Sequence, residues 1–328
     1  MFKILLTCPP MIKQSNMYSE LFKEHNLEVF IPKFTQTLSE EELCNLLPNF
    51  DGWIIGDDPA TRKVFETGIK GRLKAAVKWG VGTDNVDFEA CKDLNIPITN
   101  IPGVFGEEVS DVAIGYLLCL TRQLHIINDR HKKGEWYKPC GVSLTNKKVC
   151  LLGFGDIGRS TARKLLAFNL NVYVSDPGFI KENDNIICKY NSNIKIDDTL
   201  NKVKLLDLNE CLEDADFIIC TCPLTKETHH IINKEKILKA KEGVIIINVG
   251  RGSVIKEEDI IELLENGYIK SVGFDVFEEE PLKKNNKLRN YEQNIYGSHN
   301  SSNTKEAVDK VSKIAIETIN KFLININK

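Results

Sequence analysis

The chain has 328 residues, enough for about two domains that each bury a core of their own. Hydrophobic residues make up 42% of it and charged residues 27%, which excludes both a disordered chain and a membrane-spanning architecture. Because 43 Lys and Arg face 46 Asp and Glu, the net charge of −3 provides no strong basic field. We therefore expect neither nucleic acid nor a membrane as a partner.

The cysteines favour a reducing compartment and no metal. Ten cysteines in 328 residues are too sparse for a secreted disulfide scaffold, so we expect a cytoplasmic protein. The closest pair, Cys220 and Cys222, has no second pair or His partner to complete a zinc site. The apolar run after Lys3 is too short for a signal peptide and predicts a first strand.

The N-terminal part alternates short apolar runs with amphipathic stretches, which predicts parallel βαβ units. The expected strands cover residues 2–7, 28–31, 52–55, 75–79 and 96–99. Residues 109–131 follow with apolar positions at helical spacing and predict one long helix with a wide apolar stripe. Such a stripe requires a second surface, which either another domain or another subunit would supply.

A second series of strands predicts a doubly wound nucleotide-binding domain. Its six strands are expected at residues 148–152, 172–175, 217–221, 244–248, 272–274 and 294–296. The polar stretch 180–200 reads as a surface excursion with a strand at 186–190, and 304–324 as a final helix.

A glycine-rich loop directly follows the strand at 148–152 and precedes a helix. Gly153 permits a tight turn, Gly155 lets the backbone approach a pyrophosphate, and Gly158 lets helix and strand pack closely. A helix is expected at residues 159–168, and its N-terminus offers N–H groups to the anion. The backbone N–H groups of Asp156 and Ile157 lie just before it, with the Asp156 side chain pointing outward. The alternative is a glycine turn that binds nothing, and the strand-loop-helix context disfavours it.

The acidic residue at the end of the next strand indicates which cofactor is bound. Asp176 follows Gly158 by 18 residues, where a carboxylate accepts hydrogen bonds from ribose hydroxyls. The same carboxylate repels a 2′-phosphate, and no Arg follows closely, so we expect NAD rather than NADP.

Polar residues of the types that carbonyl reduction needs follow three later strands. A guanidinium can hold the carboxylate of a 2-oxo acid, and an acid can protonate the forming alkoxide. Arg251 and His299 suit these two roles. Each alone could be a surface charge or a turn residue, but loops at the carboxyl ends of parallel strands can bring both to one cofactor.

The sequence resembles the D-isomer-specific 2-hydroxyacid dehydrogenases over nearly its whole length, in particular their D-3-phosphoglycerate dehydrogenase-like branch. The resemblance lies in the motifs at residues 80–87, 100–103, 153–158, 223–228, 248–252, 275–281 and 299–307. It implies a Rossmann NAD-binding domain at 102–303, inserted into a flavodoxin-like substrate-binding domain made of 1–101 plus 304–328. It also implies a two-fold subunit contact at residues 134–139, after the long helix, so we expect a homodimer.

The resemblance also implies residue roles. Arg251 would bind the substrate carboxylate and carbonyl, His299 would be the acid/base, and Glu280 would pair with His299. A carboxylate beside an imidazole favours its protonated form, as an acid in carbonyl reduction requires. Lys78 and the backbone of Val81 and Gly82 would contribute to substrate binding. The remaining cofactor contacts would be Thr221, Cys222, Pro223, Thr228, Val249, Gly250, Asp275, Ser301 and Ser302.

Two questions stay open at this point. Asp57 and Asp58 follow the strand at 52–55, where two carboxylates would oppose a substrate phosphate, while Lys78 still allows an anionic distal group. Hydroxypyruvate or glyoxylate reduction is therefore an alternative to a phosphoglycerate dehydrogenase. Because the family includes corepressors, the other alternative is an NAD-sensing binding protein with little turnover.

Overall fold

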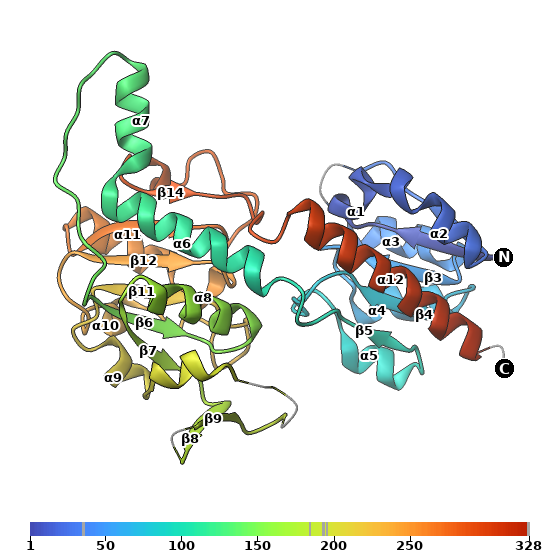
Figure 1. Ribbon diagram of the computed structural model, residues 1–328. Helices are drawn as coiled ribbons and strands as arrows, with labels where there is room; N and C mark the ends of the chain where they lie inside the picture. Colours follow the sequence, from blue (N-terminus) through green and yellow to red (C-terminus); the bar gives the residue numbers. More distant parts are fainter. Residues whose placement is uncertain (35–36, 184, 192–193, 195, 327–328) are drawn as a thin grey trace. The chain divides into compact units, whose positions relative to one another are not determined.

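The computed structural model describes residues 1–34, 37–183, 185–191, 194 and 196–326, which form two compact units (Figure 1). The first unit combines Met1–Phe105 with Asn303–Lys328, and the second is the continuous segment Gly106–Ser302. The sequence predicts the two crossings at 101–102 and 303–304. Among the described residues, no helix is both long enough and apolar enough to cross a membrane.

The first unit is built on a five-stranded parallel sheet with the order β2-β1-β3-β4-β5. This is the flavodoxin-like order, so the predicted fold class is confirmed for this unit. The central strands β3 and β4 are buried along their whole length, as expected for a sheet covered on both faces. The strands are β1 Phe2–Leu6, β2 Leu27–Phe30, β3 Gly52–Ile55, β4 Ala75–Lys78 and β5 Ile98–Thr99.

Helices from both ends of the chain cover this sheet. The C-terminal helix α12 (Lys305–Ile326) contacts β3 and β4 (Figure 1). Trp79 Nε1 donates a hydrogen bond to Ser312 Oγ on this helix at 3.1 Å. The other helices are α1 Pro9–Lys13, α2 Ser19–Glu24, α3 Glu40–Leu46, α4 Arg62–Ile69 and α5 Phe88–Asp93, with 3₁₀ turns at Ser15–Tyr18 and Leu47–Asn49.

The second unit is built on a seven-stranded parallel sheet with the order β10-β7-β6-β11-β12-β13-β14. Its first six strands follow the doubly wound order of a dinucleotide-binding fold, which confirms the predicted Rossmann class. The strands are β6 Lys148–Leu152, β7 Asn171–Ser175, β10 Lys204–Leu205, β11 Phe217–Cys220, β12 Val244–Asn248, β13 Ile269–Phe274 and β14 Ile295–Tyr296.

Helices of the second unit pack on this sheet and on one another. Helices α6 and α8 also contact each other. The helices are α6 Gly106–Arg122, α7 Leu124–Lys132, α8 Asp156–Ala167, α9 Leu208–Leu212, α10 Lys234–Ile237 and α11 Glu257–Glu265, with 3₁₀ turns at Asp198–Lys202, Gly252–Val254 and Lys287–Asn290.

The structure differs from the sequence prediction in three local features. The single helix at 109–131 is two helices, because Gln123 takes a left-handed backbone conformation with φ 53° that ends α6 and redirects α7. The excursion at 180–200 holds an antiparallel hairpin of β8 (Phe179–Glu182) and β9 (Asn185–Cys188), where only a strand at 186–190 was expected. The edge strand β10, with two residues, is too short to produce a periodic pattern.

The packing of α12 leads to a stability prediction. Ile316 on α12 is fully buried, so we expect Ile316→Ala to lower the free energy of unfolding by about 2–5 kcal/mol. The matched change Ile324→Ala, at a side chain 43% exposed on the same helix, should cost far less. Urea unfolding followed by tryptophan fluorescence reports mainly the first unit, which holds Trp53 and Trp79. Equal losses in the two variants would contradict this packing.

Candidate active site

The glycine loop after β6 has the geometry that a pyrophosphate requires. Gly153 has φ +96°, which favours glycine, and a Cβ on Gly158 would lie 2.2 Å from the carbonyl oxygen of Gly153. A Cβ on Gly155 would meet no atom within 4 Å, so this backbone borders open space. The loop leads directly into α8, whose first N–H groups can bind an anion. The loop therefore fits a dinucleotide.

Asp176 follows β7 and is held beside this loop by two backbone amides. Its Oδ2 accepts a hydrogen bond from Phe154 N at 2.6 Å, and its Oδ1 accepts one from Gly178 N at 2.7 Å. The carboxylate is thus fixed next to the glycine loop, and each oxygen retains lone-pair capacity for a ribose hydroxyl.

The Asp156 side chain lies in the first turn of α8 and is close to Arg159 of the same helix. Its Oδ1 lies 3.9 Å from Arg159 Nη2 one turn along the helix. Arg159 itself donates to the carbonyl oxygen of Phe154 at 3.1 Å. A negative charge in the first turn is favourable for the helix, and the ion pair compensates it near the predicted anion site.

The other predicted cofactor residues lie at the carboxyl ends of β11 and β12. Thr221 Oγ1 donates to the carbonyl oxygens of Leu152 and Gly153, which joins β11 to the glycine loop. Burial raises the pKa of the Cys222 thiol to about 12, so this group stays protonated. The predicted residues in these two loops are Thr221, Cys222, Pro223, Thr228, Val249 and Gly250.

The loop after β12 presents Arg251 on a turn held by Asn248. Asn248 Nδ2 donates to the Arg251 carbonyl oxygen at 2.9 Å, and its Oδ1 accepts from Gly250 N at 3.1 Å. A Cβ on Gly250 would lie 2.7 Å from the carbonyl oxygen of Cys222, so only glycine fits there. Arg251 is half-buried and donates to the Gly250 carbonyl oxygen at 3.0 Å.

Asp275, at the end of β13, organises the loop that carries His299. Its carboxylate is 1% exposed and accepts hydrogen bonds from Asn300 N at 3.2 Å, from Ser301 N at 2.9 Å and from the Ser301 hydroxyl. The Asp275 carbonyl oxygen accepts from His299 N at 2.7 Å. Its expected role as a cofactor contact stays a prediction, whereas its hydrogen bonds to residues 299–301 are observed.

Tyr116 on α6 also reaches Asp275, a contact that the sequence did not indicate. Its hydroxyl lies 3.5 Å from Asp275 Oδ1. Burial and the charge of Asp275 raise the pKa of Tyr116, so its hydroxyl remains a neutral donor. The only sequence signal was the helical spacing of Tyr116 with apolar residues.

The predicted pair of His299 and Glu280 is formed. Nδ1 of His299 lies 2.7 Å from Oε2 of Glu280, and the two side chains are 38% and 34% exposed. The other oxygen of Glu280, Oε1, accepts from Phe277 N at 2.9 Å, which fixes the carboxylate. Because Nδ1 is directed at Glu280, the expected proton transfer of His299 would take place at the opposite ring nitrogen, Nε2. This arrangement can transfer a proton to or from an oxygen.

Glu278 has a structural role that its sequence context does not reveal. The sequence predicts that Glu278 and Glu279 are solvated neighbours of Glu280, which suits Glu279, 62% exposed and paired with Lys283. Glu278 instead accepts from Glu257 N at 2.9 Å and lies 3.0 Å from His230 Nε2. Its own N–H donates to Glu257 Oε1 at 2.7 Å. These bonds attach the Glu280 loop to the start of α11.

The predicted substrate residues of the first unit follow β4. Asn100 Nδ2 donates to the Val81 carbonyl oxygen at 2.9 Å, which holds the turn that contains Val81 and Gly82. Lys78 is buried, with its amine near the Gly56 carbonyl oxygen and Asp57. The assignment of these residues to a substrate stays a prediction.

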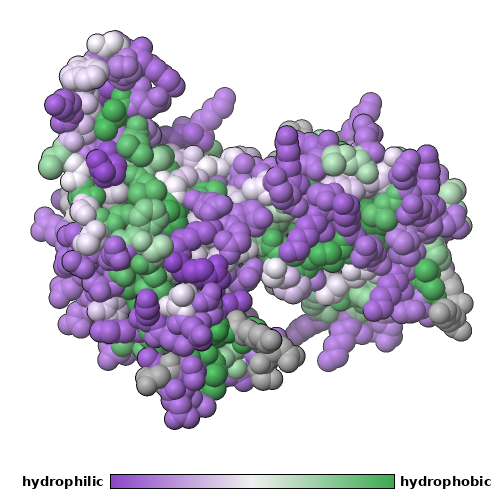
Figure 2. All heavy atoms as spheres, viewed as in Figure 1, coloured by the Kyte–Doolittle hydropathy of each residue, from purple (hydrophilic) through white to green (hydrophobic). Residues whose placement is uncertain are grey.

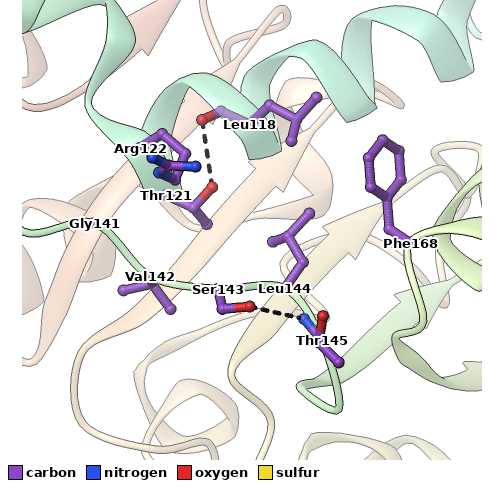
Figure 3. A pocket seen from close by; sticks show the side chains of 9 residues that line it. All are labelled: Leu118, Thr121, Arg122, Gly141, Val142, Ser143, Leu144, Thr145 and Phe168. Atoms are coloured by element: carbon purple, nitrogen blue, oxygen red, sulfur yellow. Dashed lines mark hydrogen bonds between the residues drawn. The ribbon is translucent and has the colours of Figure 1, made fainter.

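A cavity of about 430 Å³ lies apart from all these residues, between the end of α6 and the segment before β6 (Figure 3). In it, Leu118, Leu144 and Phe168 provide an apolar wall, and Thr121 Oγ1 and Ser143 Oγ take part in local hydrogen bonds. None of the predicted site residues lines it.

Comparison with known proteins agrees with this geometry. Residues 114–301 match the family described as D-isomer specific 2-hydroxyacid dehydrogenase, NAD binding domain. Over 308 residues the chain is 32% identical to hydroxypyruvate reductase of Thermotoga maritima, covering 92% of this chain and 93% of that protein. Over 289 residues it is 32% identical to D-3-phosphoglycerate dehydrogenase of Methanocaldococcus jannaschii, covering 87% of this chain but only 52% of that protein.

A solved structure extends the similarity to the whole chain. The TT0316 protein from Thermus thermophilus is similar with a TM-score of 0.82 and 25% identity, covering 98% of this chain and 97% of that one.

The glycine loop gives a sharp binding prediction. Gly158→Ala places a methyl group against the Gly153 carbonyl, so we expect NADH binding to weaken by at least about tenfold, or about 1.4 kcal/mol. Gly115→Ala on α6 is the matched control, because a Cβ there meets no atom within 4 Å. Titration of NADH fluorescence measures both variants. Unchanged affinity in Gly158→Ala would refute the assignment of this loop to the cofactor.

Proposed function

The chain belongs to the D-isomer specific 2-hydroxyacid dehydrogenase family, and on this premise we propose that it reduces a small 2-oxo acid with NADH, with His299 as the acid/base. Members of this family are NAD-dependent oxidoreductases that act on a CH–OH group. The observation that carries the proposal is the 2.7 Å contact of His299 with Glu280.

Each site residue has a separate role in the proposed reaction. When bound, NADH supplies the hydride for the carbonyl carbon. Nε2 of His299 donates the proton to the carbonyl oxygen, and Glu280 compensates the charge of the imidazolium before that transfer. Arg251 binds the substrate carboxylate and polarises the carbonyl. Val81 and Gly82 contribute backbone N–H groups from the substrate-binding domain, which we assign to residues 1–101 plus 304–328.

The specific activity that we propose is hydroxypyruvate or glyoxylate reduction, with phosphoglycerate dehydrogenation as the competing activity. The similarity to a hydroxypyruvate reductase over nearly all of both chains supports the first. An NAD-sensing protein with little turnover remains the alternative outcome of the kinetic test below. The ten cysteines are all thiols, which supports a cytoplasmic location.

Kinetics on a panel of 2-oxo acids test the proposal. We expect NADH-dependent reduction of at least one of hydroxypyruvate, 3-phosphohydroxypyruvate, glyoxylate and phosphonopyruvate. His299→Ala should lower kcat by about 100-fold or more, because the proton donor is lost. Glu280→Gln should cause a smaller loss and move the fall in reductase activity to lower pH, since a neutral amide no longer favours the protonated imidazole.

The matched control for the second change is Glu279→Gln, at a surface carboxylate paired with Lys283. It should leave kcat and its pH profile unchanged. Tight NADH binding without turnover of any acid would favour the NAD-sensing alternative, and normal turnover in His299→Ala would remove the acid/base assignment.

We also propose that the chain is a homodimer formed through α7 and the neighbouring part of α6. Leu124 and Trp136 are 48% and 81% exposed there, and Figure 2 shows hydrophobic residues among hydrophilic ones on this part of the unit. Light scattering at micromolar concentration should give twice the chain mass of 37.1 kDa. Leu124→Glu should raise the monomer fraction, while Met17→Glu, at a side chain 69% exposed in the first unit, should not. A wild-type monomer mass would refute the dimer.

A further inference from the structure

A buried lysine and an exposed aspartate form an ion pair at the carboxyl edge of the first unit's sheet. Lys78, the last residue of β4, has a side chain only 4% exposed, and its Nζ lies 3.1 Å from Asp57 Oδ1. The same ammonium donates to the carbonyl oxygen of Gly56, directly after β3. The Asp57 side chain is 60% exposed. At this edge the Asp57 carboxylate is therefore exposed to solvent, and the Lys78 ammonium that balances its charge is buried.

The loop that carries Asp57 is fixed from several sides. Asn85 Nδ2 donates to the carbonyl oxygens of Gly56 and Asp58, at 3.1 and 2.7 Å. A Cβ on Gly56 would lie 2.5 Å from the Thr7 carbonyl oxygen, so no side chain, cationic or otherwise, fits at the first position after β3. The backbone of residues 56–58, which positions the ion pair, is thus held by hydrogen bonds and by a close contact with Thr7.

The neighbouring carboxylate does not share this role. Asp58 is fully buried, its Oδ1 accepts from Leu38 N at 2.9 Å, and burial raises its pKa. The sequence predicts that both carboxylates oppose a substrate phosphate, but only Asp57 is exposed at this edge. Any charge selection at this position therefore depends on Asp57.

Ligands of open parallel sheets bind outside the carboxyl ends of the strands. Asp57 follows β3 at this edge, and the Val81–Gly82 turn follows the adjacent strand β4. Because these two strands are neighbours, a substrate bound by the Val81–Gly82 turn, as proposed above, would lie near Asp57 as well.

We propose that Asp57 is a specificity-determining residue. It neutralises Lys78 and directs the protein towards 2-oxo acids whose distal group is uncharged, against those that carry a phosphate. The inference rests on the proposed function and refines it. A phosphate placed beside Asp57 meets a like charge, whereas the hydroxyl or hydrogen of an uncharged substrate does not.

The test is the ratio of kcat/KM for hydroxypyruvate to kcat/KM for 3-phosphohydroxypyruvate, with NADH. We expect the wild-type ratio to exceed about tenfold. Asp57→Asn removes the negative charge, leaves Lys78 uncompensated, and should lower the ratio by at least about tenfold. Asp57→Ser provides a second variant with the same expectation should the first fold poorly.

Asp93→Asn is the matched control. Asp93 is likewise a carboxylate 60% exposed in an ion pair, with Arg62 as its partner. It should leave the ratio unchanged, which separates a local effect from a general change in surface charge.

The outcomes distinguish the two proposals. Reduction of both acids with a wild-type preference for the phosphorylated one would overturn the role of Asp57 and leave the proposed function intact. Equal changes for the two acids in the Asp57 variants would also overturn that role. No reduction of either acid, nor of any other in the panel, would overturn the proposed function and this inference with it.

Discussion

Three loops of the second unit meet at the carboxyl ends of β6, β11 and β12 with no room for side chains between them. A Cβ on Gly158 would lie 2.2 Å from the Gly153 carbonyl oxygen, one on Gly153 would lie 2.8 Å from Cys222 N, and one on Gly250 would lie 2.7 Å from the Cys222 carbonyl oxygen. The close backbone packing at these three glycines fixes the start of α8 and the position of the turn that carries Arg251. Because the sheet is parallel, the same edge also receives Asp275.

Carboxylates that are buried or half-buried and bound by backbone amides hold the remaining loops in place. Asp176 accepts from Phe154 N and Gly178 N, Asp275 from Asn300 N and Ser301 N, and Glu257 from Glu278 N. Each bond satisfies a carboxylate that would otherwise be costly to bury and fixes the conformation of a loop. In this way the His299–Glu280 pair is positioned by neighbours on both sides, Asp275 at one and Glu278 at the other.

The sequence predicted the features that repeat or that depend on one residue type. Apolar runs predicted the long strands, and the spacing from Gly153 to Asp176 predicted the nucleotide loop, because glycine and carboxylate have few substitutes there. The break at Gln123 was missed, since a left-handed residue other than glycine leaves no compositional mark. Glu278 and Glu279 look alike in sequence, and only the fold brings Glu257 and His230 to the first of them.

The near-neutral charge of the chain limits how either unit can bind an anion. With a net charge of −3, the chain has no extended basic field, so the anion recognition that we propose relies on local groups: the start of α8, the turns of backbone N–H groups and Arg251. Lys78 is a further cation, but its ammonium lies 3.1 Å from Asp57 Oδ1. An ion that is buried without a counter-charge is costly, and the Asp57 carboxylate offsets that cost for Lys78. The cation at this edge is therefore already paired within the protein.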